Sequence, residues 1–236
     1  MKTILSALYC VLACCRTICA DFQNLGFEAA NTNNVPGVIG TPEDLIPHWQ
    51  LSLGPTAVTY LGLNYFPLSQ GYHTLANTSG RTFVFSISVY PIQGNYALFV
   101  SPPIPHAGES FIPYSLTQSG VIPATADKIE FLNFGAPVQL LINGMPLPLT
   151  YTYINPSPLD EAFRSALVIG DISSYAGRDV ELRFTTIRST QSGYIYGLDD
   201  IRFTSVPEPG TFALPAFGGL MLGWRTVQQR RRRCAN

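Results

Sequence analysis

Short runs of alternating apolar and polar side chains recur along the chain between residues 83 and 203. In the run DVELRFTT at 179–186, Val180, Leu182 and Phe184 alternate with charged residues. One face of this run would therefore be buried and the other would face water, as in a strand at the surface of a core. Comparable runs predict further strands at 83–90, 95–101, 128–134, 138–142 and 166–169.

The residues between these runs favour turns. Asn143-Gly144 directly follows the run at 138–142 and is a strong hairpin signal. Prolines stand between the runs or at their ends, where strands tolerate them. No convincing helical period is present, and the best candidate is a single turn from Asp171 to Gly177. The pattern predicts an all-β fold over residues 21–205, an antiparallel β-sandwich of the jelly-roll type.

The first 20 residues, MKTILSALYCVLACCRTICA, have the pattern of a secretory signal peptide. Lys2 supplies the positive start, an apolar run follows, and the small Ala20 precedes Asp21, where we expect cleavage. The apolar run is shorter than the roughly 20 residues that span a bilayer. The expected partner is the secretory translocon. Two alternatives stay open, a buried N-terminal helix and lipoprotein processing at Cys14.

The C-terminal segment combines three features. Pro207-Glu208-Pro209 resists both helix and sheet. The following residues, Gly210 to Trp224, are apolar and uncharged, and arginines stand behind them. This arrangement predicts a short transmembrane helix whose arginine-flanked end stays on the cytoplasmic side. Residues 234–236 form a short tail.

The three features together closely resemble the PEP-CTERM sorting signal of Gram-negative bacteria, over residues 206–233. Pro215 within the apolar run and TVQQ before the last arginines depart from its usual pattern. The resemblance implies transient anchoring in the inner membrane, processing by an exosortase, and delivery to the cell surface or extracellular matrix. An ordinary membrane anchor and an unrelated basic tail are the alternatives. The motif residues are Val206, Pro207, Glu208, Pro209, Arg225, Arg230, Arg231, Arg232 and Arg233.

Charge and cysteine are unevenly distributed. Residues 21–206 hold 14 of the 15 acidic residues but only seven of the 14 basic ones, which gives this stretch a net charge of −7. Such a body does not suit a phosphate backbone, so we expect no nucleic-acid partner. All five cysteines lie outside the stretch, so neither a disulfide framework nor a cysteine metal site can stabilise it.

A second resemblance links the body to jelly-roll carbohydrate-binding modules, through Asn24–Glu28, Trp49, the stretch 170–177 and Gly197–Phe203. It implies a structural Ca²⁺ bound by Glu28 with Asp199 or Asp200, since calcium prefers oxygen ligands. Asp199 shares the parity of the apolar Ile201 and should point inward, which favours it as the ligand. In the alternative reading, Asp199 caps a turn or pairs with an arginine and Asp200 is solvated.

The sequence shows no catalytic motif, so we expect no enzyme. Tyrosines and Trp49 could stack on sugar rings, although aromatic residues also fill sandwich cores. We therefore expect an exported, non-catalytic structural or adhesive component of a biofilm matrix. The alternatives are a module that binds exopolysaccharide and, third, a glycan-active enzyme. The aromatic candidates are Trp49, Tyr60, Tyr65, Tyr72, Tyr114, Tyr151, Tyr153, Tyr194 and Tyr196.

Overall fold

The computed structural model describes residues 21–35, 38–64, 72–78, 82–84, 87–89, 93–103, 110–155, 164–187 and 195–205. The chain divides into one compact unit, Met1–Thr204, and a second, Ser205–Asn236. The predicted signal peptide and the predicted sorting signal, with its Pro-Glu-Pro motif and arginines, both lie outside the described residues. Within the described ranges, no helix has the length and apolar character needed to cross a membrane.

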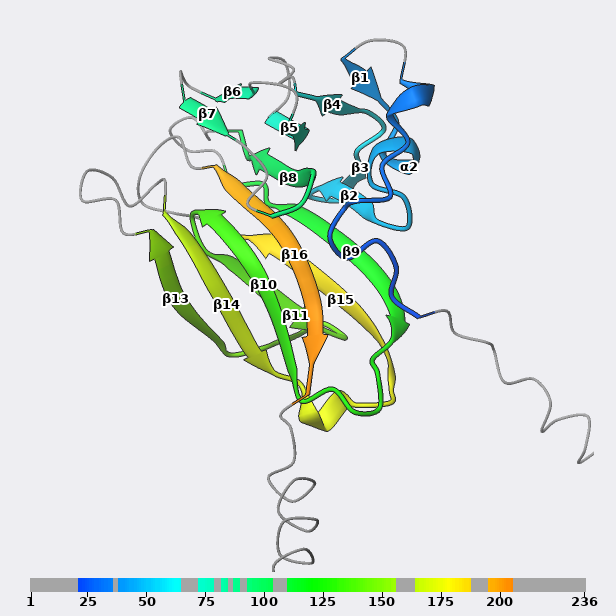
Figure 1. The fold of residues 1–236 in the computed structure, drawn as a ribbon, viewed down its shortest axis with the longest axis vertical. Helices are drawn as coiled ribbons and strands as arrows, with labels where there is room; N and C mark the ends of the chain where they lie inside the picture. Colours follow the sequence, from blue (N-terminus) through cyan, green and yellow to red (C-terminus); the bar gives the residue numbers. More distant parts are fainter. Residues whose placement is uncertain are drawn as a thin grey trace, which may run out of the picture. The chain divides into compact units, whose positions relative to one another are not determined.

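The larger sheet has eight strands (Figure 1). Neighbouring strands run antiparallel, except that β4 and β5 are parallel. In spatial order the strands are β1 (Ile39–Gly40), β4 (Leu61–Leu63), β5 (Tyr72–Asn77), β8 (Tyr96–Ser101), β16 (Tyr196–Thr204), β10 (Lys128–Gly135), β14 (Ser165–Asp171) and β13 (Leu149–Asn155).

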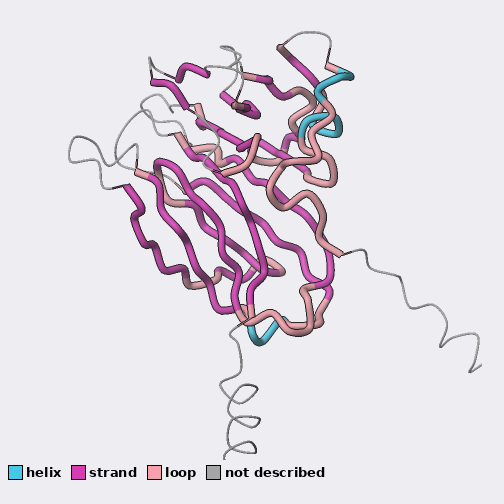
Figure 2. The backbone as a smooth tube through the Cα atoms, in the orientation of Figure 1, coloured by secondary structure: helices cyan, strands magenta, loops and turns pink. Residues whose placement is uncertain are grey.

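The second sheet has six antiparallel strands. In spatial order they are β12 (Met145–Pro146), β11 (Val138–Ile142), β15 (Asp179–Thr186), β9 (Tyr114–Val121), β2 (Gln50–Leu53) and β3 (Thr56–Ala57). A separate pair is formed by β6 (Thr82–Val84) and β7 (Ile87–Val89). Helical structure is short (Figure 2). Among the described residues it comprises α2 (Pro42–Leu45) and two 3₁₀ turns, Thr32–Asn34 and Ser173–Tyr175.

The two sheets enclose one hydrophobic core. From β8 onward the chain crosses repeatedly between them, so that β9, β11 and β15 lie in the second sheet while β10, β14 and β16 lie in the first. Figure 1 shows the two layers facing each other. The ring of Phe184 on β15 lies 5.2 Å from Phe131 on β10 and 6.1 Å from Trp49. Alternating burial along β15 and β14 buries one side of each strand here.

Most of the predicted strands are confirmed. The bounds of β15 are those expected from its alternation, and β8, β10, β11 and β14 match their runs to within a residue or two. Asn143 and Gly144 both have positive φ and join β11 to β12, as a tight hairpin turn requires. In the predicted turn after Asp171, that carboxylate accepts hydrogen bonds from both the amide and the hydroxyl group of Ser173.

Two expectations are wrong. Residues 83–90 do not form one strand, because β6 and β7 fold back on each other with Val84 opposite Ile87. The chain also has a helix that the sequence analysis missed, α2. Thr41 caps it by accepting a hydrogen bond from the Asp44 amide at 3.2 Å, and Pro42 occupies its first turn.

Candidate functional site

Two of the three predicted metal ligands, Glu28 and Asp199, lie around one segment of chain, residues 93–96. Oε1 of Glu28 accepts hydrogen bonds from the backbone N–H groups of Asn95 at 2.7 Å and Tyr96 at 3.1 Å, and Oε2 accepts one from the Asn95 side chain at 3.0 Å. Gly94, directly before Asn95, has φ +66°, and a Cβ there would collide with the Glu28 carboxylate. Glu28 therefore fixes the entry into β8.

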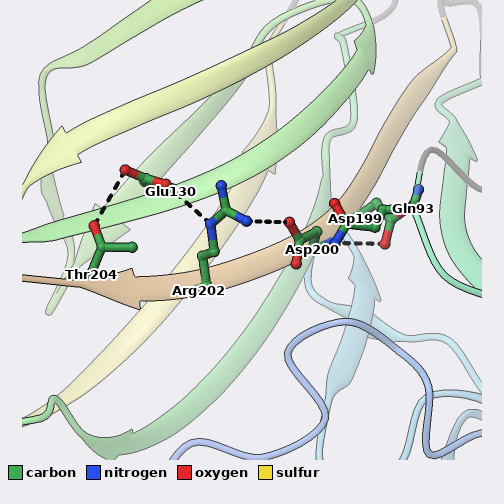
Figure 3. Close-up of polar contacts among 6 residues, drawn as sticks. All are labelled: Gln93, Glu130, Asp199, Asp200, Arg202 and Thr204. Carbon is green, nitrogen blue, oxygen red and sulfur yellow. Dashed lines mark hydrogen bonds and ion pairs between the residues drawn. The ribbon is translucent and has the colours of Figure 1, made fainter.

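Asp199 holds the same segment from β16. It is only 1% exposed, although a register shift in β16 interrupts the alternation that would have placed it on the face of Ile201. Oδ2 accepts a hydrogen bond from the Gln93 backbone at 2.8 Å, and Oδ1 accepts one from the Asp200 backbone at 2.7 Å (Figure 3). These two bonds offset part of the cost of burying a carboxylate.

Asp200 belongs to a surface network instead. It has φ 45°, and its carboxylate lies 3.1 Å from the guanidinium of Arg202. Arg202 also contacts Glu130 at 3.0 Å, and the Thr204 hydroxyl donates to Glu130 at 3.3 Å (Figure 3). Arg202 is 46% exposed, so these pairs contribute little to stability.

Glu28 and Asp199 are thus brought to a common segment, whereas Asp200 pairs with an arginine. Within the part of the chain that the structure describes, no three His, Cys, Asp or Glu side chains are grouped so that they could hold a metal ion. The calcium site stays a prediction. We call Glu28, Asp199 and residues 93–96 the carboxylate clamp.

A polar pocket of about 250 Å³ lies at the edge of β9. The β2 strand pairs with β9 only as far as Gln50 opposite Thr117, and Asp21 then bridges Val121 in parallel. The pocket occupies the interval between these two pairings. We call it the Gln118 pocket, and its lining residues are Asp21, Gln23, His48, Gln50, Thr117, Gln118, Ser119 and Glu181.

Gln118 builds this pocket. Its parity on β9 is that of the buried Tyr114 and Leu116, and it is itself only 7% exposed. Its Oε1 accepts a hydrogen bond from the Gln23 amide at 2.9 Å. Its Nε2 donates to the carbonyls of Gln23 at 2.9 Å and of His48 at 3.1 Å. One buried amide thereby fixes two walls that lie far apart in the sequence.

The remaining lining side chains are accessible to solvent. Asp21, Gln23, His48, Gln50 and Ser119 are exposed. Glu181 is half-buried and pairs with Arg183 at 2.8 Å. His48 has φ 72°, an unusual conformation for a non-glycine residue, and its carbonyl is held by Gln118.

Most of the described aromatic candidates for sugar stacking have structural roles. Trp49, Tyr114 and Tyr196 are buried in the core. Tyr151 donates a hydrogen bond to the Val138 carbonyl at 2.7 Å, and burial raises the pKa of its hydroxyl group to about 12. Tyr153 is 48% exposed, on β13. Tyr60 is half-buried, with its ring centroid 5.1 Å from that of His73. Tyr65, Tyr194 and the side chain of Tyr72 lie outside the described residues.

The Gln118 pocket was not anticipated from the sequence. Its lining comes from four segments that are distant in the chain, and its side chains are those of any solvated strand face. The one usable signal was Gln118, a polar residue at an inward-facing position of an alternating run. The predicted cleavage point does adjoin the pocket, because Asp21 lines it.

Comparison with known proteins gives only distant structural likenesses. No family model matches the chain, and no curated protein matches it. Among solved structures, a carbohydrate-binding module, TmCBM61, determined in complex with β-1,4-galactotriose, is 15% identical with a TM-score of 0.37, over 79% of this chain and 99% of that module. The enzymatically active domain of tailspike protein 4 of bacteriophage CBA120 is 11% identical with a TM-score of 0.35. That match covers 71% of this chain and about a fifth (21%) of the tailspike chain.

Proposed function

We propose that residues 21–205 form an exported jelly-roll module that binds a polysaccharide without cleaving it, in the Gln118 pocket. The crossings of the chain between the two sheets from β8 to β16 support the jelly-roll assignment. The observation that carries the binding proposal is the pocket itself, a concave site lined by amides, hydroxyls and carboxylates.

The chemistry of the lining suits a ligand rich in hydroxyl groups. Gln23 and Gln50 offer both donors and acceptors, Thr117 and Ser119 offer hydroxyls, and Asp21 accepts. At about 250 Å³ the pocket is slightly smaller than typical ligand sites of roughly 300–1,000 Å³, so it would hold about one sugar unit. We expect modest affinity from one pocket of this size.

The charges favour a neutral glycan over an acidic one. The pocket contains two carboxylates, Asp21 and Glu181, and the stretch 21–206 carries a net charge of −7. A uronic acid would be repelled by this negative charge, of which Arg183 and the amino terminus of a chain that begins at Asp21 offset only a part. A neutral sugar is not repelled by these carboxylates, which are strong acceptors for hydrogen bonds from its hydroxyl groups.

Binding without hydrolysis follows from the surroundings of the same two carboxylates. A glycosidase needs one carboxyl group that stays protonated near neutral pH, which burial in apolar surroundings normally achieves. Asp21 is exposed, and Glu181 is paired with Arg183. Neither carboxyl group is therefore buried in apolar surroundings.

The proposal also gives the two chain ends a role in bringing the module to its site of action. Export through the signal peptide, followed by exosortase processing near Pro207-Glu208-Pro209, would deliver the module to the cell surface or the matrix. There, glycan binding would give it its structural or adhesive role. Cleavage between Ala20 and Asp21 would leave the new amino terminus beside the pocket, because Asp21 is part of the lining.

The proposal is tested by filling the pocket. Ser119→Trp places a large side chain at an exposed lining position, and Thr56→Trp places the same side chain at an exposed position of β3 outside the pocket. We expect the parent protein and Thr56→Trp to be retarded in affinity gels containing a neutral polysaccharide, and Ser119→Trp to migrate freely. Equal retardation of all three proteins, or of none across a panel of neutral glycans, would contradict the proposal.

A further inference from the structure

The edge strands of the two large sheets differ in length and composition. Each of the two large sheets ends in two edge strands, which are β1 and β13 in one and β12 and β3 in the other. Three of these four strands contain two residues each, and β12 also contains Pro146. Short edges and prolines are the usual means by which proteins prevent unwanted strand pairing.

The fourth edge, β13, has none of these protections along most of its length. It contains seven residues, Leu149–Asn155, with the sequence LTYTYIN, and carries neither charge nor proline. Among the described strands it pairs with β14 alone. Its residues are of the types that favour strands, and one register shift interrupts the pairing between Tyr153 and Asn155. Leu149 to Tyr153 therefore form a regular edge.

The side chains of this edge are accessible. Thr150 and Thr152 are exposed, Tyr153 is 48% exposed and Ile154 is 50% exposed. The ring of Tyr153 also lies 5.5 Å from the guanidinium carbon of Arg164, at the start of β14. An uncharged and accessible edge of this length can accept another strand.

The sequence of the edge is self-complementary in an antiparallel arrangement. If two copies pair about Tyr151, Thr150 of one lies opposite Thr152 of the other, and Leu149 lies opposite Tyr153. The two Tyr151 residues then lie opposite each other. Threonine pairs and aromatic pairs across strands each contribute roughly 0.2–1 kcal/mol. This self-match favours a second copy of the chain over an unrelated strand.

We propose that β13 is an interface through which two copies of this protein pair edge to edge, joining their eight-stranded sheets into one. The pairing is two-fold symmetric and uses the same edge in both copies, so it closes at a dimer. The shortness of β1, β3 and β12 prevents the other edges from extending the assembly. A dimer would carry two Gln118 pockets and could cross-link polysaccharide chains.

Charge substitutions at the two exposed threonines test this interface. In the proposed pairing, Thr150→Lys/Thr152→Lys places lysine opposite lysine, and Thr150→Glu/Thr152→Glu places glutamate opposite glutamate. We expect the protein as purified from producing cells to change from monomer to dimer in sedimentation runs as its concentration rises to about 500 µM. Each double variant should dimerise at least about tenfold more weakly. Two copies that each carry a net negative charge repel each other. Added salt screens this repulsion, so it should strengthen the parent dimer.

The decisive arm mixes the two variants. A 1:1 mixture pairs lysine with glutamate, so it should form heterodimers at least as well as the parent protein forms dimers. Thr56→Lys/Ala57→Lys, on the short edge β3, is the matched control and should dimerise like the parent. A parent protein that stays monomeric would overturn the proposal. So would a mixture that stays monomeric, a lysine variant that dimerises normally, or a control that fails to dimerise.

Discussion

At the scale of single residues, His73 on β5 has an unusual environment. Its side chain is only 3% exposed, and Nδ1 lies 2.8 Å from the Tyr114 hydroxyl. Nε2 is buried and makes no hydrogen bond in the structure. Burial lowers the pKa of this imidazole below 6.5, against the opposing effect of the Tyr60 backbone. The ring is therefore neutral in the folded protein at neutral pH.

The stability of the fold should depend on this histidine in mildly acidic solution. Below about pH 6.5 the unfolded chain binds a proton at this position more readily than the folded chain. The contribution of neutral His73 to the unfolding free energy is therefore complete above pH 6.5. It is lost as the pH falls toward the lower pKa of the folded state. We expect His73→Gln to flatten the dependence of the unfolding free energy on pH between 6.5 and 5, measured by urea denaturation.

The exposed Thr56 provides the control for this prediction. Thr56→Gln should leave the pH dependence in the same window unchanged, because it adds and removes no titratable group. A parent protein whose stability does not decrease from pH 6.5 to 5, or a Thr56 variant with the flatter profile, would show that His73 is not responsible.

At the scale of elements, the carboxylate clamp ties the N-terminal loop and β16 to the entry of β8. We expect Glu28→Gln to lower the unfolding free energy by about 1 kcal/mol, because a neutral amide accepts the two backbone hydrogen bonds less strongly than a carboxylate. Chemical denaturation measures this loss. Glu43→Gln, at an exposed position of α2, is the control. It should change the unfolding free energy by no more than about 0.5 kcal/mol.

The same variant tests the predicted calcium site. If calcium binds at the clamp, its addition after chelator treatment should raise the melting temperature of the parent protein, and Glu28→Gln should reduce that increase. Identical melting temperatures of the parent in chelator and in calcium would contradict the calcium prediction. In that case the two carboxylates would be held by hydrogen bonds from Gln93, Asn95 and Tyr96, without a calcium ion.

The elements also show what the sequence pattern can predict. The β15 strand was predictable because one of its faces is charged and the other apolar. By contrast, β9 was missed, although it is central in its sheet, because YSLTQSGV has few apolar residues. The division of 83–90 into β6 and β7 was missed because no glycine or proline marks the reversal. The start of α2 was visible in Thr41-Pro42, but its four residues are too few to show a helical period.

Neither the clamp nor the Gln118 pocket could be predicted from local patterns. Asp199 is buried, but not through simple alternation, because a register shift between Glu130 and Leu132 and the positive φ of Asp200 interrupt the alternation of β16, and both Leu198 and Ile201 face the core. The partners of Asp199 and the walls of the pocket depend on which strands become neighbours. That information is distributed over the whole chain, so a local pattern could not supply it.

At the scale of the whole molecule, the proposed binding module stands in the sequence between two predicted processing signals. Intact mass measurement of the exported protein tests both signals together. We expect a chain that begins at Asp21 and ends near Pro207-Glu208-Pro209, without the arginines Arg230 to Arg233. Replacing Glu208 by alanine should leave the tail attached, whereas Glu43→Ala should not. A surface-released chain that still ends at Asn236 would contradict exosortase processing, and a chain that retains Met1 would contradict signal cleavage.

The most direct test of the account is to map where a sugar binds. In amide NMR spectra of the protein titrated with a neutral oligosaccharide, we expect the largest shifts at Gln23, Gln50 and Thr117 to Ser119, which line the pocket. Resonances of β13 and of the carboxylate clamp should stay in place. Shifts that cluster elsewhere, or no shifts with any neutral oligosaccharide at millimolar concentration, would contradict the claim that this pocket binds polysaccharide.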